Sequence, residues 1–253
     1  MDEFKGKTAL VTGASRGIGA ATAVSLARAG VSRVAIQYNS YPEGAEQTLS
    51  LARAAGAEAI AIQADLSTVE GIHSMTAAIG KEAPDVDILV NNAGALIRRS
   101  PLADYTEDLF DAIMNLNVKS LWFISKAVAP RMAARGEGVI VNVSSIAARN
   151  GGGPGATIYA AAKAAVSAIT KGLSKELAPR GIRVNAISPG TVDNHFHEVY
   201  STREILDSVV KMTPAGRLGT NQEMADCILF LCSGKAAYIH GQTIEINGGG
   251  YMI

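Results

Sequence analysis

Tyr159 and Lys163 are the side chains whose types and spacing first point to chemistry in this sequence. They lie four residues apart, about one helical turn, so a helix would carry a phenol and an ammonium group on one face. A free tyrosine has a pKa of about 10, and a neighbouring cation favours the phenolate. The spacing therefore predicts a proton donor with a lowered pKa, although an ordinary surface pair on a helix has the same spacing.

A glycine-rich segment follows a short apolar run near the N-terminus. Residues 8–11 predict a buried strand, and a helical pattern at 18–28 begins among the glycines Gly13, Gly17 and Gly19. Glycines at such a junction let the backbone turn tightly and bring N–H groups and the helix N-terminus onto a pyrophosphate. The spacing is G-x-x-x-G-x-G and not the usual dinucleotide G-x-G-x-x-G, so a glycine turn that binds nothing is the alternative.

Further polar and small residues each follow a predicted strand or lie in the helix beyond it. In chain order they are Asp65-Leu66, Asn91-Asn92-Ala93-Gly94, Asn117, Ser144-Ser145 and Ser188-Pro189-Gly190. Ligands of open parallel α/β sheets bind at the carboxyl ends of the strands. Any one of these residues could serve only as a turn residue or helix cap, but together they predict a shared site.

Strand and helix patterns alternate along the whole chain. The expected strands span residues 8–12, 33–38, 59–63, 86–90, 138–143, 182–187 and 242–246. This alternation predicts an α/β fold in which helices cover both faces of a parallel sheet. No segment remains for a separate substrate domain, so 1–253 is expected to form one domain. Residues 191–219 are expected to form a substrate-binding loop or lid, because long loops in compact domains are commonly binding lids.

The composition suits one large domain, since the chain has 253 residues and 48% are apolar. A formal net charge of zero and the lack of a basic stretch argue against nucleic acid or an anionic membrane as a partner. The N-terminal residues lack the apolar core of a signal peptide, so a cytoplasmic location is expected. Cys227 and Cys232 are expected to be core thiols, and His195-x-His197 lacks further ligands, so no metal is expected.

The ordered motifs resemble the short-chain dehydrogenase/reductase family over residues 7–252. The resemblance implies a single NAD(P)-binding Rossmann domain with strand order 3-2-1-4-5-6-7. It implies an oxidoreductase that reduces a carbonyl, with a catalytic tetrad of Asn117, Ser145, Tyr159 and Lys163, while Ser144 shapes the turn. Members of the fold that serve only as binding modules usually lose part of this tetrad, which is complete here.

The resemblance also assigns a role to each tetrad residue. Tyr159 would protonate the carbonyl oxygen, and Ser145 would hydrogen-bond to the same oxygen. Lys163 would hold the nicotinamide ribose and lower the tyrosine pKa, and Asn117 would position a water that links Lys163 to solvent.

The end of the second expected strand bears on the choice of cofactor. An NAD-preferring site usually has a carboxylate there, but Tyr38-Asn39-Ser40 contains no acid, and Arg16 in the glycine-rich segment could pair with a 2′-phosphate. NADPH is therefore expected in preference to NADH, unless Arg16 is only a solvated loop residue. The expected cofactor-binding residues are Gly13, Ser15, Arg16, Gly17, Ile18, Gly19, Tyr38, Asn39, Ser40, Asp65, Leu66, Asn92, Ala93, Gly94, Tyr159, Lys163, Pro189, Gly190 and Val192.

Two substrate classes remain open. The stretches 213–219 and 241–249 resemble bacterial 3-oxoacyl-carrier-protein reductases. Local features at 38–44, 149–156 and 196–197 resemble bacterial reductases of alginate-derived deoxy-keto uronates.

Basic side chains would suit a small anionic substrate, because an arginine binds a carboxylate through two hydrogen bonds. Arg98, Arg99, Arg149 and His197 could reach the mouth of the site, although an acidic carrier protein would also suit them. A small keto acid or sugar-derived keto uronate is the favoured substrate. Its expected contacts are Ser145, Arg149, Tyr159 and His197.

Two apolar helical stretches, 112–132 and 160–177, bear on assembly. The family resemblance implies that these helices pair across two-fold interfaces and that the C-terminal strand adds a second contact, which gives a homotetramer. The alternative is that both helices only cover the sheet.

Overall fold

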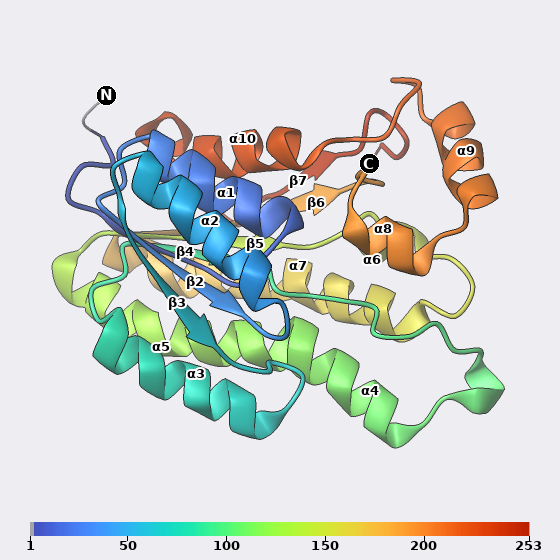
Figure 1. The fold of residues 1–253 in the computed structure, drawn as a ribbon, viewed down its shortest axis with the longest axis horizontal. Helices are drawn as coiled ribbons and strands as arrows, with labels where there is room; N and C mark the ends of the chain where they lie inside the picture. Colours follow the sequence, from blue (N-terminus) through green and yellow to red (C-terminus); the bar gives the residue numbers. More distant parts are fainter. Residues whose placement is uncertain (1–2, 253) are drawn as a thin grey trace.

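A seven-stranded parallel sheet forms the centre of the molecule, as a computed structural model of residues 3–252 shows (Figure 1). The outermost residues of the expected domain 1–253 lie outside the described part. The sheet has the order β3-β2-β1-β4-β5-β6-β7, so the expected fold class and strand order are confirmed. Its strands are β1 (Thr8–Val11), β2 (Arg33–Tyr38), β3 (Glu58–Gln63), β4 (Ile88–Asn91), β5 (Gly138–Val143), β6 (Ile182–Pro189) and β7 (Thr243–Ile246).

Helices cover both faces of the sheet (Figure 1). One face carries α1 (Gly17–Arg28), α2 (Pro42–Ala54) and α10 (Asn221–Cys232). The other carries α3 (Val69–Glu82), α5 (Ser120–Arg135) and α7 (Thr157–Leu177), with α4 (Glu107–Met114) packed beside α7. Three short helices, α6 (Ala147–Asn150), α8 (His195–Tyr200) and α9 (Arg203–Met212), lie toward the carboxyl ends of the strands. Because both faces are covered, the central strands are nearly continuous apolar runs.

Polar residues interrupt this apolar core at the carboxyl ends of β4 and β5. Asn91 and Asn142 are register partners, and Asn91 Nδ2 donates to Asn142 Oδ1 at 2.9 Å. The Asn142 amide donates in turn to the Thr170 hydroxyl of α7 at 2.9 Å, and Asn91 also donates to Ser125 of α5. A connected buried network of this kind fixes its members in one arrangement. It therefore fixes the strand ends from which the site residues project.

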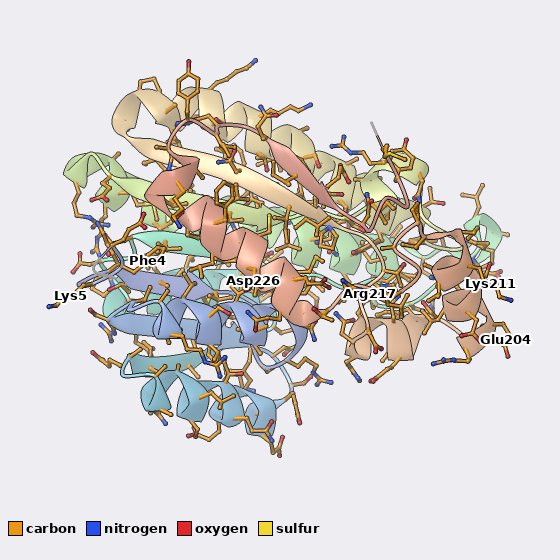
Figure 2. All side chains as sticks on the ribbon, turned by 90° about the horizontal axis from the view of Figure 1, so that it is seen from above. Phe4, Lys5, Glu204, Lys211, Arg217 and Asp226 are labelled. Carbon is orange, nitrogen blue, oxygen red and sulfur yellow. The ribbon has the colours of Figure 1, made fainter. Side chains whose placement is uncertain are left out.

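The two ends of the loop region 191–219 are paired with each other. Val192 and Gly219 pair as a parallel bridge, and Asp193 N donates to Gly219 O at 2.9 Å. Helix α9 has no buried residue. Figure 2 shows Glu204 and Lys211 on its outer side, at the edge of the molecule.

Both cysteines are free and belong to the core, as expected from the sequence. Burial raises the pKa of Cys232 to about 12, so its thiol is protonated at neutral pH. None of the helices among residues 3–252 is long and apolar enough to cross a membrane.

Candidate active site

A cavity of about 710 Å³ opens at the carboxyl edge of the sheet. The glycine-rich segment, the ends of β4, β5 and β6, helix α7 and the 191–219 region surround it. Ser145, Tyr159 and Lys163 line the cavity, and Asn117 lies buried beside them. The structure thus brings together the four residues expected to form the tetrad.

Tyr159 and Lys163 lie on the buried face of α7, as their spacing predicted. Burial raises the pKa of Tyr159 to about 12, although a hydrogen bond with Ser145 partly opposes this. The expectation of a lowered tyrosine pKa is therefore wrong in this structure. The loss of hydration is the largest cause of the raised pKa, and the Lys163 Nζ lies 5.7 Å from the Tyr159 ring centroid. The phenol is protonated at neutral pH and can donate its proton.

Lys163 points its ammonium toward the backbone at the end of β5. Nζ donates to Val143 O at 2.9 Å, and burial lowers the pKa of the group to about 8. Gly94 leaves room for it, because a Cβ at that position would lie 2.6 Å from Lys163 Nζ and 2.7 Å from Asn117 Oδ1. The ammonium and the amide oxygen therefore face the same small space.

Asn117 lies in a π-helical turn, η2 (Asn115–Lys119), between α4 and α5. Its Nδ2 donates to Ala95 O and Ile113 O, each at 2.9 Å. Its Oδ1 is buried and has no hydrogen-bond partner among residues 3–252. Such an orphaned acceptor costs about 1–3 kcal/mol, and π turns often occur at functional sites. The arrangement therefore suits a water or ligand donor beside Lys163.

The two adjacent serines have different hydrogen-bond partners. Ser144 Oγ donates to Lys163 O at 2.8 Å and lies 2.9 Å from Ser167 Oγ, so it ties β5 to α7. Ser145 instead accepts from Ala147 N at 3.1 Å and hydrogen-bonds with Tyr159 in the cavity.

The glycine-rich segment makes a tight turn at the edge of the cavity. Gly13 has φ +63°, and its N–H donates to Gln37 Oε1 of β2 at 2.9 Å. A Cβ on Gly19 would lie 2.4 Å from Gly13 O, so only glycine permits this close turn. The start of α1 faces the cavity through Gly17 and Ile18. These features fit a nicotinamide dinucleotide.

Most of the expected cofactor residues line the cavity. They are Gly13, Arg16, Gly17, Ile18, Asn92, Ala93, Gly94, Tyr159, Lys163, Pro189, Gly190 and Val192. The others lie outside its lining, namely Ser15, Gly19, Tyr38, Asn39, Ser40, Asp65 and Leu66. The Leu66 side chain is buried in the core, and the Asp65 carboxylate accepts from Ser67 N and Oγ. A role for Leu66 must therefore use its backbone. Both Ser67 donors bind Asp65 Oδ1, so Asp65 Oδ2 is the carboxylate oxygen left for a ligand.

The structure corrects the expectation that Arg149 contacts the substrate. Arg149 lies at the end of α6 and is absent from the cavity lining. Its Nε pairs with Glu245 Oε1 of β7 at 2.8 Å, with side-chain exposures of only 22% and 14%. This half-buried ion pair holds the guanidinium against β7 and away from the cavity.

His197 and Arg99 line the cavity, and Arg98 does not, although both arginines are exposed. His197 Nδ1 lies 3.1 Å from Ser201 Oγ. Burial lowers the pKa of the imidazole to about 4, and the Arg99 charge adds to this effect, so the ring is neutral at pH 7. Arg99 donates to Tyr200 O and to Pro154 O, each at 2.9 Å.

Sequence reasoning missed the aromatic and apolar wall opposite the strand ends. The Phe196 ring centroid lies 5.8 Å from that of Tyr159 and 4.9 Å from that of Tyr200. Leu206 and Val209 of α9 extend this wall. The available signal was their helical spacing, but a motif search for polar residues does not detect it.

Comparison with known proteins places the chain in a family. A family model described as enoyl-(acyl carrier protein) reductase matches residues 13–251. With this match, the chain belongs to the short-chain dehydrogenase/reductase family and is an NAD(P)-dependent oxidoreductase.

Individual relatives fall into different substrate groups. The 3-oxoacyl-[acyl-carrier-protein] reductase FabG of Escherichia coli K12 is 39% identical over 254 residues, 99% of each chain. The crystal structure of a DEH reductase A1-R′ mutant is 34% identical with a TM-score of 0.90, over 100% of this chain and 99% of that one. Another structure shows A1-R′ as an NADH-dependent reductase responsible for alginate metabolism, at 34% identity, full coverage of both chains and a TM-score of 0.89. A Beutenbergia cavernae structure described as an NAD(P)-dependent gluconate 5-dehydrogenase with bound NADP is 33% identical, with a TM-score of 0.90 and 98% of both chains covered.

Proposed function

We propose that this protein is an NADPH-dependent reductase that converts the carbonyl of a small keto acid or sugar-derived keto uronate to an alcohol. The observation that carries the reductive direction is the buried Tyr159 phenol, which is protonated at neutral pH and hydrogen-bonded with Ser145. A phenol that carries its proton at neutral pH can donate it as negative charge develops on a carbonyl oxygen.

Each tetrad residue has a step in this mechanism. The glycine-rich segment would hold a nicotinamide dinucleotide, which would supply the hydride. Tyr159 donates its proton to the carbonyl oxygen, and Ser145 hydrogen-bonds to that oxygen and orients it. Lys163 would hold the nicotinamide ribose, and its ammonium would stabilise the phenolate that remains. Asn117 Oδ1 accepts a hydrogen bond from a water beside Lys163, through which a proton returns to Tyr159.

Two features support NADPH over NADH. The end of β2 carries no carboxylate, so nothing there repels a 2′-phosphate. Arg16 lines the cavity, and none of the ion pairs found among residues 3–252 involves it. The similar structures include both an NADH-dependent reductase and one with bound NADP, so the preference needs direct measurement.

The rim of the cavity supports a compact anionic substrate. Arg99 supplies a cation, and neutral His197 can donate one hydrogen bond to a substrate hydroxyl or carboxylate. The aromatic wall of Phe196 and Tyr200 offers flat apolar surfaces to the C–H face of a sugar. The 191–219 region would close over such a substrate as a lid. The likeness of the whole chain to DEH reductase A1-R′ supports the same class of substrate.

A second candidate, 3-oxoacyl-carrier-protein reduction, is supported by the apolar α9 side chains at the cavity and by the FabG relatives. One assay separates the two. NADPH and NADH oxidation are measured with a keto uronate, a neutral diketone and an acetoacetyl thioester. The proposal requires the highest kcat/KM with the keto uronate and NADPH. Preference for the thioester would establish the second candidate instead.

A further inference from the structure

Tyr41 supports the only cation of the glycine-rich segment. The guanidinium carbon of Arg16 lies 4.2 Å from the centroid of the Tyr41 ring. Tyr41 is half-buried and directly precedes α2. A guanidinium that stacks through its face leaves the N–H donors at its edge free for an anion. Tyr41 can therefore orient Arg16 without occupying the groups that bind phosphate.

The ring of Tyr41 is itself held by the start of α2. A Cβ on Gly44 would lie 2.2 Å from Tyr41 Cε1 and 2.2 Å from Ser15 O, so the helix packs directly on both. Thr48 Oγ1 donates to Ala14 O at 3.0 Å and ties the next turn of α2 to the same segment. Tyr41 thus lies between the close contact at Gly44 and the guanidinium of Arg16.

We propose that Tyr41 is a positioning residue that selects NADPH, because it holds Arg16 where the cofactor 2′-phosphate binds. This inference rests on the proposed use of NADPH. The end of β2 lacks a carboxylate that could discriminate by repulsion, so discrimination depends on attraction by Arg16. A mobile arginine loses side-chain entropy when it binds phosphate, whereas a stacked one has already lost part of it.

The test measures nucleotide affinity and needs no substrate. NADPH and NADH are titrated by nucleotide fluorescence into the wild type, Tyr41→Leu, Tyr41→Phe and Arg16→Ala. Loss of the stacking contact should raise the Kd for NADPH in Tyr41→Leu about 3- to 10-fold and change the Kd for NADH less than about twofold. Tyr41→Phe keeps the ring and should bind both nucleotides like the wild type. Arg16→Ala shows how much the guanidinium contributes in total to NADPH affinity.

Each other outcome has a defined meaning. The inference would be overturned if the Kd values for NADPH and NADH rise equally in Tyr41→Leu and also in the more polar Tyr41→Gln. The ring would then only support the loop. Unchanged NADPH binding in Tyr41→Leu, with selective loss in Arg16→Ala, would overturn it while the proposed cofactor stands. Wild-type protein that binds NADH at least as tightly as NADPH would overturn both.

Discussion

Tyr159 is a buried, neutral phenol at the wall of the cavity, with Ser145 beside its hydroxyl. Tyr159→Phe removes the proton donor and keeps the ring that packs near Phe196. We expect kcat to fall by about 10²- to 10⁴-fold, the usual contribution of a positioned general acid. The Kd for NADPH should stay close to the wild-type value in a fluorescence titration. A variant that keeps substantial reductase activity would exclude Tyr159 as the proton donor.

The pH dependence of reduction should report Lys163. Burial lowers the pKa of Lys163 to about 8. Its side chain is therefore fully protonated well below pH 8 and loses its charge as the pH rises through that value. Tyr159, with a pKa of about 12, remains protonated over the same range. We therefore expect kcat/KM for reduction to fall as the pH rises above about 8. A profile that declines only near the ordinary lysine pKa would show that the ammonium is not held as the structure implies.

The residue scale also shows the limits of sequence reasoning. The shared helix face of Tyr159 and Lys163 follows from a four-residue spacing, so it was predictable. The direction of the tyrosine pKa was not, because burial depends on elements far along the chain that cover the ring. Arg149 was misplaced for a similar reason, since its partner Glu245 lies 96 residues away and no local pattern links them.

At the scale of elements, the Arg149–Glu245 pair joins α6 to the edge strand β7. Arg149→Met should leave a half-buried carboxylate unpaired and lower the free energy of unfolding by about 1–3 kcal/mol. Arg149→Met/Glu245→Gln should recover much of this loss. Chemical denaturation measures the free energy of unfolding of both variants.

In Arg149→Met, the KM values for a keto acid and a neutral diketone should change to the same extent. A rise in KM for the keto acid alone would show that Arg149 contacts the substrate.

The strands were predictable because parallel strands covered on both faces form apolar runs bounded by glycine and polar residues. The expected and observed strands differ by no more than two residues at either end. The π turn at Asn117 was not predictable, because it depends on packing against α7 and leaves the local sequence pattern unchanged. The aromatic wall of α8 has a helical spacing in the sequence, but that spacing does not show that the rings face a cavity.

At the scale of the whole molecule, large apolar side chains are exposed on several helices. Phe110 of α4 and Trp122 of α5 are 42% and 43% exposed, and Phe230 and Tyr238 lie exposed near α10. These surfaces support the proposed homotetramer, because two different two-fold contacts are required. Light scattering should give four times the 26.2 kDa chain mass.

Trp122→Glu tests the surface formed by α4 and α5. It should reduce the tetramer to a smaller species, since a charge would be buried in the interface. Leu51→Glu replaces an exposed apolar residue on α2 and should leave the mass unchanged. A wild-type monomer at micromolar concentration would exclude the tetramer.

The bridge between Val192 and Gly219 closes the 191–219 region at its base. The two ends of this region are therefore joined to each other, and the chain between them enters and leaves the sheet edge at almost one point. The segment between Val192 and Gly219 can therefore be exchanged as one unit, with these two residues kept as the junctions. Grafting the corresponding segment of a FabG relative between these two residues would transfer substrate range between family members and keep the sheet, the glycine-rich segment and the tetrad of this protein.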